Sequence, residues 1–133
     1  MENREIRAAA DQADWQIILG VSAGIGFVAW RMFAAFALAL GEPPNYLFAL
    51  GALGESCLCA FLVWRLSRGS LVAAYALFMI WLLGFGYAWL TSESGIPPFF
   101  LISLLITVGL VQGILGSHAR RRAAIDVPLP NER

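Results

Sequence analysis

The sequence predicts an all-α fold: a polytopic membrane protein built as a compact up-down bundle of four transmembrane helices. Of the 133 residues, 59% are hydrophobic and 14% are charged, and the mean hydropathy is +0.72. A soluble domain of this size would need more polar surface to cover its core. The apolar residues also form four blocks of roughly 20 residues, the length that crosses a hydrocarbon core about 30 Å thick. These blocks do not alternate with period two, which predicts helices rather than the strands of a barrel.

The segments between the blocks set the order of the elements. The turn at 41–45 contains Pro43-Pro44, which ends one helix and favours the start of the next. The links at 65–70 and 91–98 are also short and polar, so consecutive helices are expected to be antiparallel neighbours. The predicted segments are a cytoplasmic lead at 1–14 that forms a short juxtamembrane helix, spans at about 15–40, 46–64, 71–90 and 99–116, and a cytoplasmic, disordered tail at 117–133.

The arginines predict the orientation. All nine basic residues are arginine, a composition that, together with the abundant alanine, suggests a bacterial protein of the inner membrane. Seven of them lie in the lead, the middle link and the tail next to a span: Arg4, Arg7, Arg65, Arg68, Arg120, Arg121 and Arg122. The other two turns contain no basic residue and one carboxylate each, Glu42 and Glu93. By the positive-inside rule, both termini and the middle link are expected to be cytoplasmic.

Two charged residues lie inside predicted spans, Arg31 in the first and Glu55 in the second. An arginine at such a depth is unfavourable by about 2.5–3.5 kcal/mol on insertion scales and usually faces the bundle or a wet cavity. Arg31 shares a helix face with Gly20 and Gly24, and the rise from each helix end places Arg31 and Glu55 within about 5 Å in depth. We therefore expect an intramembrane ion pair. Two interpretations stay open and are weighted evenly: a polar site on a substrate or ion pathway, and a structural lock in which each charge neutralises the other.

Small residues predict close helix packing. Gly20 and Gly24 in the first span, and Gly109 and Gly113 in the fourth, have the small-xxx-small spacing that lets backbones approach. Gln112 is the third buried polar candidate. We expect its side-chain amide to form a hydrogen bond that holds two helices together, in preference to contacting a ligand. The pattern leaves open whether the packing is within one chain or between chains.

The remaining polar residues exclude several functions. Cys57 and Cys59 are two positions apart on a helix and point to opposite sides, so they cannot bind one metal ion together. His118 has no Cys, Asp or Glu near it in sequence. We therefore expect no metal, no cofactor and no catalytic site. The run Arg120-Arg121-Arg122 is expected to anchor the helix and attract anionic lipid; nucleic-acid binding would need a larger basic surface.

These observations favour a small, non-enzymatic accessory or structural subunit that acts through helix packing, with the lipid bilayer, and a larger membrane complex or a homo-oligomer, as its partners. The first alternative is a small oligomeric transporter or channel with a mid-membrane site at Arg31 and Glu55. The second, less favoured, is a membrane enzyme acting on lipid or quinone, for which Glu42 and Glu93 are the candidate carboxylates. The sequence does not identify a substrate.

Overall fold

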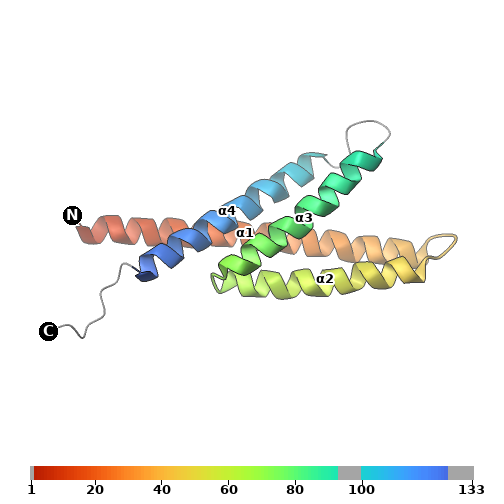
Figure 1. The fold of residues 1–133 in the computed structure, drawn as a ribbon, viewed down its shortest axis with the longest axis horizontal. Coiled ribbons are helices and arrows are strands. Elements are labelled where there is room, and N and C mark those ends of the chain that lie inside the picture. Colours follow the sequence, from red (N-terminus) through yellow and green to blue (C-terminus); the bar gives the residue numbers. More distant parts are fainter. Residues whose placement is uncertain (1, 93–99, 126–133) are drawn as a thin grey trace.

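The computed structural model of the chain describes residues 2–92 and 100–125, and these form an all-helical, up-down arrangement (Figure 1). The four helices are α1 (Glu2–Leu40), α2 (Tyr46–Ser67), α3 (Leu71–Thr91) and α4 (Phe100–Ile125). All four are long and apolar enough to cross a membrane. The predicted fold class is confirmed, and the chain is a multi-pass membrane protein.

Two helices are longer than the predicted spans. The lead does not form a separate juxtamembrane helix, because α1 runs without a break from Glu2 to Leu40. At the other terminus, residues 117–125, which were assigned to a disordered tail, continue α4 as helix. Both extensions are rich in alanine and arginine, which have high helix propensity. The predicted turn at 93–98 and the tail from residue 126 onward lie outside the described residues.

Side-chain caps start the two middle helices. Asn45 accepts a hydrogen bond from the backbone N–H of Phe48 at 3.3 Å, and Ser70 accepts one from Ala73 at 3.4 Å. Both residues satisfy a donor that the first helical turn leaves unpaired. Gly69, next to the second cap, has a φ of +78°, a conformation that favours glycine.

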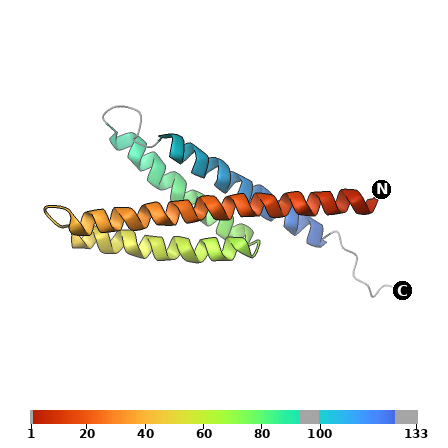
Figure 2. The same cartoon turned by 180° about the vertical axis from the view of Figure 1, so that it is seen from behind.

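The helices form two antiparallel hairpins, α1–α2 and α3–α4, which cross each other (Figures 1 and 2). Helix α1 packs along α2 and α4, and α3 packs against α2 and α4. We call the end where α1 begins, α2 meets α3 and α4 finishes its described part the terminal end. The end that holds the 41–45 turn is the turn end.

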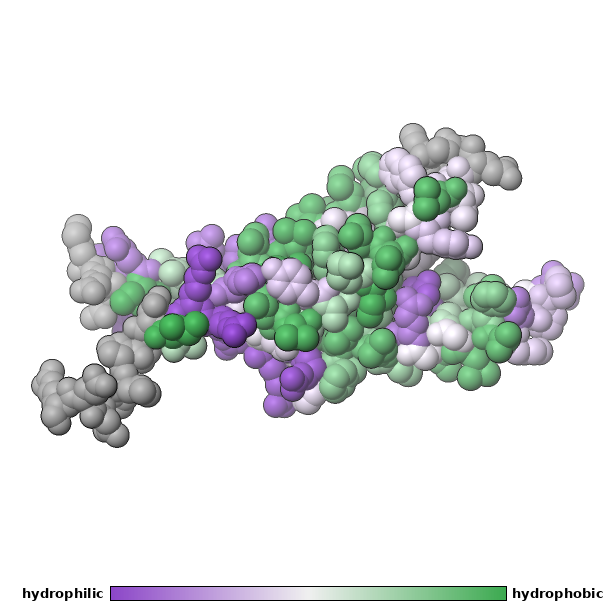
Figure 3. Space-filling view, viewed as in Figure 1, coloured by the Kyte–Doolittle hydropathy of each residue, from purple (hydrophilic) through white to green (hydrophobic). Residues whose placement is uncertain are grey.

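The hairpins diverge toward the turn end (Figure 1). Burial follows this separation: the last buried residue of α3 is Trp81 and the first of α4 is Ile106, whereas α1 and α2 stay packed as far as Ala35 and Ala49. Large apolar side chains are exposed on all four helices, as on a lipid-facing surface. In Figure 3 hydrophobic residues cover the middle of the molecule, and hydrophilic ones gather toward the terminal end and at the turn, with one hydrophilic patch where the hairpins diverge.

Candidate functional site

Arg31 lies on the inward-facing seam of α1. Buried residues recur along this helix at three- and four-residue intervals: Ala13, Ile17, Gly20, Gly24, Phe27 and Ala35. Arg31 occupies the position between Phe27 and Ala35 in this series. The periodicity of the helix therefore turns the guanidinium inward, at the level where the α3–α4 hairpin moves away.

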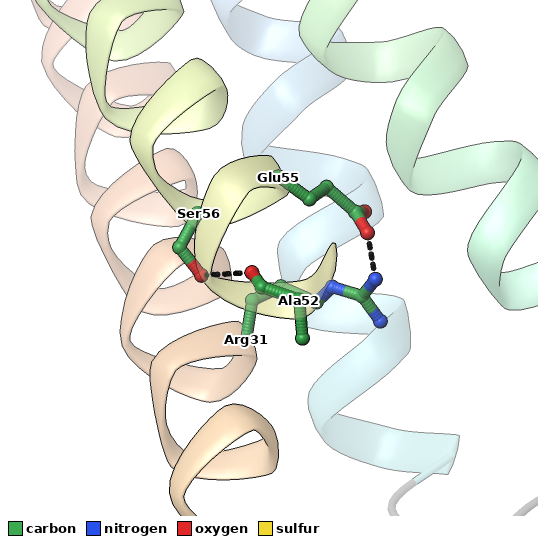
Figure 4. A network of polar contacts seen from close by, with 4 residues as sticks. All are labelled: Arg31, Ala52, Glu55 and Ser56. Atoms are coloured by element: carbon green, nitrogen blue, oxygen red, sulfur yellow. Dashed lines mark hydrogen bonds and ion pairs between the residues drawn. The ribbon is translucent and has the colours of Figure 1, made fainter. Parts of the chain in front are cut away.

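Arg31 and Glu55 form the expected contact between α1 and α2. The Nη2 of Arg31 donates to Oε2 of Glu55, and the pair lies on the side of α2 that faces α3 and α4 (Figure 4). The neighbouring Ser56 is buried and donates from Oγ to the carbonyl oxygen of Ala52 at 2.9 Å. Ser56 thus satisfies its own hydroxyl within α2 and leaves the carboxylate of Glu55 to Arg31.

The ion pair is neither fully buried nor fully satisfied. The side chains of Arg31 and Glu55 are 31% and 29% exposed. A guanidinium has five N–H donors, and among the described residues only one of those of Arg31 has a partner; its Nε is buried without one. The pair therefore retains hydrogen-bonding capacity on its exposed side.

A cavity of about 310 Å³ adjoins the pair and is lined by residues of all four helices. Five aromatic residues contribute to its wall: Phe27, Trp30, Trp81, Phe85 and Tyr87. Ser103 of α4 is the remaining polar lining residue beside the ion pair. An apolar, aromatic wall with a few polar groups on one side is the usual composition of a small-molecule site.

Trp81 fixes the aromatic wall. Its ring meets Phe27 edge-on, with centroids 5.0 Å apart and an angle of 79° between planes, and it stacks on Phe85 at 5.9 Å. The indole Nε1 donates to Thr107 Oγ1 at 2.9 Å, and Thr107 in turn donates to the Ser103 carbonyl oxygen at 2.7 Å. Sequence reasoning missed Thr107. The sequence feature that indicates it is the pair of hydroxyl residues Ser103 and Thr107, one helical turn apart in the apolar first half of the fourth span.

The apolar core closes the site on the side of the terminal end. Leu66, Leu77 and Leu110 come from three different helices, and all are at most 1% exposed. They belong to the same cluster as Phe27 and Trp81. Packed side chains therefore bound the cavity on the side of the terminal end, and its other side faces the space where the hairpins separate.

The predicted packing glycines lie at helix contacts within the chain. A Cβ on Gly20 would come within 2.5 Å of Gly113 Cα, and one on Gly109 within 2.5 Å of Ala23 Cβ. Gly24 faces α2 and α3, because its Cβ would meet Val63 at 2.6 Å and Leu77 at 3.0 Å. Close approach of α1 and α4 therefore depends on the absence of side chains.

Gln112 lies away from the ion pair. It is half-buried and lines an apolar groove of about 750 Å³ between α1 and α4, together with Ser22 and Gly26. In the part of the chain that the structure describes, no hydrogen bond joins its amide to another helix. The structure therefore places Gln112 at a helix interface but gives it no partner there.

The other singled-out residues are at the terminal end or on helix α2. Cys57 is exposed and Cys59 buried, so they point apart, and within residues 2–92 and 100–125 no group of His, Cys, Asp and Glu could hold a metal ion. His118 forms a 2.9 Å hydrogen bond with Tyr75. The Arg120 side chain lies against Gly69.

No protein-family model, curated protein or solved structure matches the chain.

Proposed function

We propose that this chain is a small, non-enzymatic membrane protein that binds an uncharged amphipathic molecule between its two hairpins, with the Arg31–Glu55 pair as the polar anchor. The observation that carries the proposal is that Arg31 and Glu55 line the aromatic cavity with side chains about 30% exposed, while only one N–H group of Arg31 has a partner among the described residues. In hydrocarbon, donors without partners are unfavourable. A bound acceptor oxygen would satisfy them.

The surroundings define the class of ligand. Arg31 and Glu55 together carry no net charge, so a charged ligand would place an uncompensated charge inside the membrane. The free N–H groups of Arg31 match a carbonyl or ester oxygen, and the rings of Trp81 and Phe85 match an apolar or ring-bearing body. A volume of about 310 Å³ holds the polar end of such a molecule, and the rest would extend between the hairpins toward lipid.

This proposal predicts a ligand that co-purifies with the protein. Protein purified in mild detergent would be extracted with organic solvent, and the extract compared by mass spectrometry with that of Arg31→Leu/Glu55→Leu. One compound should be present at about one per chain in the parent and depleted roughly tenfold or more in the variant, because hydrogen bonds to charged groups contribute about 1.5–3 kcal/mol.

Arg65→Leu/Glu42→Leu is the matched control, because it also removes one arginine and one glutamate but from exposed positions outside the cavity. The control should retain the compound. If parent, variant and control give the same extract, the site does not bind a co-purifying molecule and the proposal fails.

A second candidate is the accessory or structural role, and the groove at Gln112 favours it. The amide lacks a partner within the described residues, and the same groove includes Gly26, where a Cβ would meet nothing within 4 Å. Gly51, Gly54 and Gly84 likewise face open space. Small residues beside an unsatisfied amide are the features that transmembrane helix interfaces use. Stoichiometric recovery of a second membrane protein that Gln112→Leu releases would support this role.

We further propose that the chain lies in a bacterial inner membrane with both termini in the cytoplasm. The support is the arrangement of charge. The seven described arginines other than Arg31 lie toward the terminal end, and Glu42 is the one charged residue of the described turn at 41–45. Green fluorescent protein fused after residue 133 should fluoresce, whereas alkaline phosphatase at that position should be inactive. An active phosphatase fusion would reverse the proposed orientation.

A further inference from the structure

The terminal end contains a second hollow that differs from the first in charge. A cavity of about 390 Å³ lies where the link between α2 and α3 meets the end of α4. Three arginines line it, Arg68 from the link and Arg120 and Arg121 from α4. The other lining residues are uncharged, and within the described part of the chain none of the three arginines forms an ion pair with a carboxylate. Within residues 2–92 and 100–125, the hollow therefore has three positive charges and no compensating negative one.

The backbone brings these arginines together. Gly69 has a φ of +78°, and Arg120 crosses directly over it: the Cδ and Nη1 of Arg120 lie 3.1 and 3.3 Å from where a Cβ on Gly69 would be. The guanidinium of Arg68 is held 4.5 Å from the ring centroid of Trp64, an arrangement stabilised by cation–π attraction. Residues about 50 positions apart in sequence thus converge because Gly69 leaves room for the α4 side chain.

The surface next to this hollow is apolar. Leu71 and Val72 open α3 at the edge of the hollow, and Val72, Met79 and Leu83 are exposed along one face of that helix. A ligand that fits both surfaces has a negative head and a hydrocarbon body. Arginine side chains bind phosphate oxygens with charge-assisted hydrogen bonds.

We propose that Arg68, Arg120 and Arg121 form a specific site for the phosphate headgroup of an anionic phospholipid, whose acyl chains lie along α3. The site is separate from the Arg31–Glu55 cavity and does not depend on a ligand there. Charge complementarity favours lipid over a protein segment, because the hollow opens at the end of membrane-spanning helices, where headgroups are present at high concentration.

The test compares two variants that remove the same charge from the same end of the molecule. Arg68→Gln/Arg121→Gln removes two arginines that line the hollow, and Arg65→Gln/Arg122→Gln removes their sequence neighbours that do not. Dioleoyl-phosphatidylglycerol would be titrated into the detergent-solubilised full chain, and the lipid-bound fraction measured by native mass spectrometry, with dioleoyl-phosphatidylcholine as the zwitterionic comparison. All substituted side chains are exposed, and the tryptophan emission of each variant checks that it is folded.

Each arginine near a headgroup contributes about 1 kcal/mol, which corresponds to roughly fivefold in affinity. Arg68→Gln/Arg121→Gln should therefore bind phosphatidylglycerol about 25-fold more weakly than the parent. The second variant should stay within about fivefold of the parent. Equal losses in the two variants would mean diffuse surface attraction and would overturn the site. Equal binding of both lipids by the parent, or displacement of phosphatidylglycerol by 10 mM inorganic phosphate, would overturn the lipid assignment.

Discussion

Replacing Glu55 with leucine while Arg31 remains is expected to destabilise the protein by about 2.5–3.5 kcal/mol, the unfavourable free energy of an unpaired arginine deep in a membrane. Glu55 provides the carboxylate that Arg31 contacts in the structure. A guanidinium cannot give up its proton under ordinary conditions, so Arg31 would stay charged. The converse variant, Arg31→Leu, should be less damaging, because an isolated carboxylate can bind a proton and become neutral.

The double variant Arg31→Leu/Glu55→Leu should recover most of the lost stability, because two apolar side chains of similar volume replace an ion pair without leaving a charge behind. Unfolding by sodium dodecyl sulfate in mild detergent, followed by tryptophan emission, gives the four free energies of this double-mutant cycle. If the losses of the two single variants simply add in the double variant, the two side chains do not interact in the membrane.

The same double-mutant cycle also distinguishes the two interpretations of the Arg31–Glu55 pair, a structural lock and a ligand-binding site. A stable double variant that no longer retains the co-purifying compound would assign a binding role to the pair. A stable double variant that retains it would leave the pair with a structural role alone. The exposure of about 30% on both side chains and their position in the lining of the aromatic cavity make the first result the expected one.

The sequence predicted the four helices because each needs little more than length and hydropathy, which are local properties. It also predicted that Arg31 and Glu55 would face each other, because a short turn joins their helices and depth can be counted along the helical rise. The sequence does not predict the continuous α1, because the lead is polar and the span that follows it is apolar. Helix propensity, which is high for the alanines at 8–10, does not change at the membrane boundary.

The angle between the hairpins could not be predicted from the sequence. It depends on which small residues of α1 meet which of α4, and three glycines on each helix, together with several alanines, offer more than one register. Trp81 illustrates the consequence: its aromatic contacts with α1 and its hydrogen bond to Thr107 on α4 depend on that angle. The cavity beside the ion pair is therefore a property of the helix crossing and has no sequence motif.

Gly20→Ala tests the crossing directly and should destabilise the protein by about 2–3 kcal/mol, within the range for overpacked cores. Its new methyl group would lie 2.5 Å from the Cα of Gly113 and 3.0 Å from its backbone nitrogen. Backbone atoms of a helix cannot rotate away as a side chain can, so α1 and α4 would have to separate. Gly26→Ala in the same helix is the matched control, because nothing lies within 4 Å of the new methyl group; it should be neutral or stabilising by up to about 1 kcal/mol.

A second pair of variants shows whether loss of stability comes from this contact or from the glycine's effect on the helix. Gly109→Ala would place a methyl group 2.5 Å from the Cβ of Ala23, so it should be destabilising alone. Adding Ala23→Gly removes the opposing methyl group and should restore most of the stability, since the exchange conserves volume. Failure of the exchange to rescue Gly109→Ala in the detergent unfolding assay would contradict the observed register of α1 and α4. Because this crossing sets how far the hairpins diverge, Gly20→Ala should also weaken binding of the molecule that we propose for the Arg31–Glu55 site, although that site lies about three helical turns away.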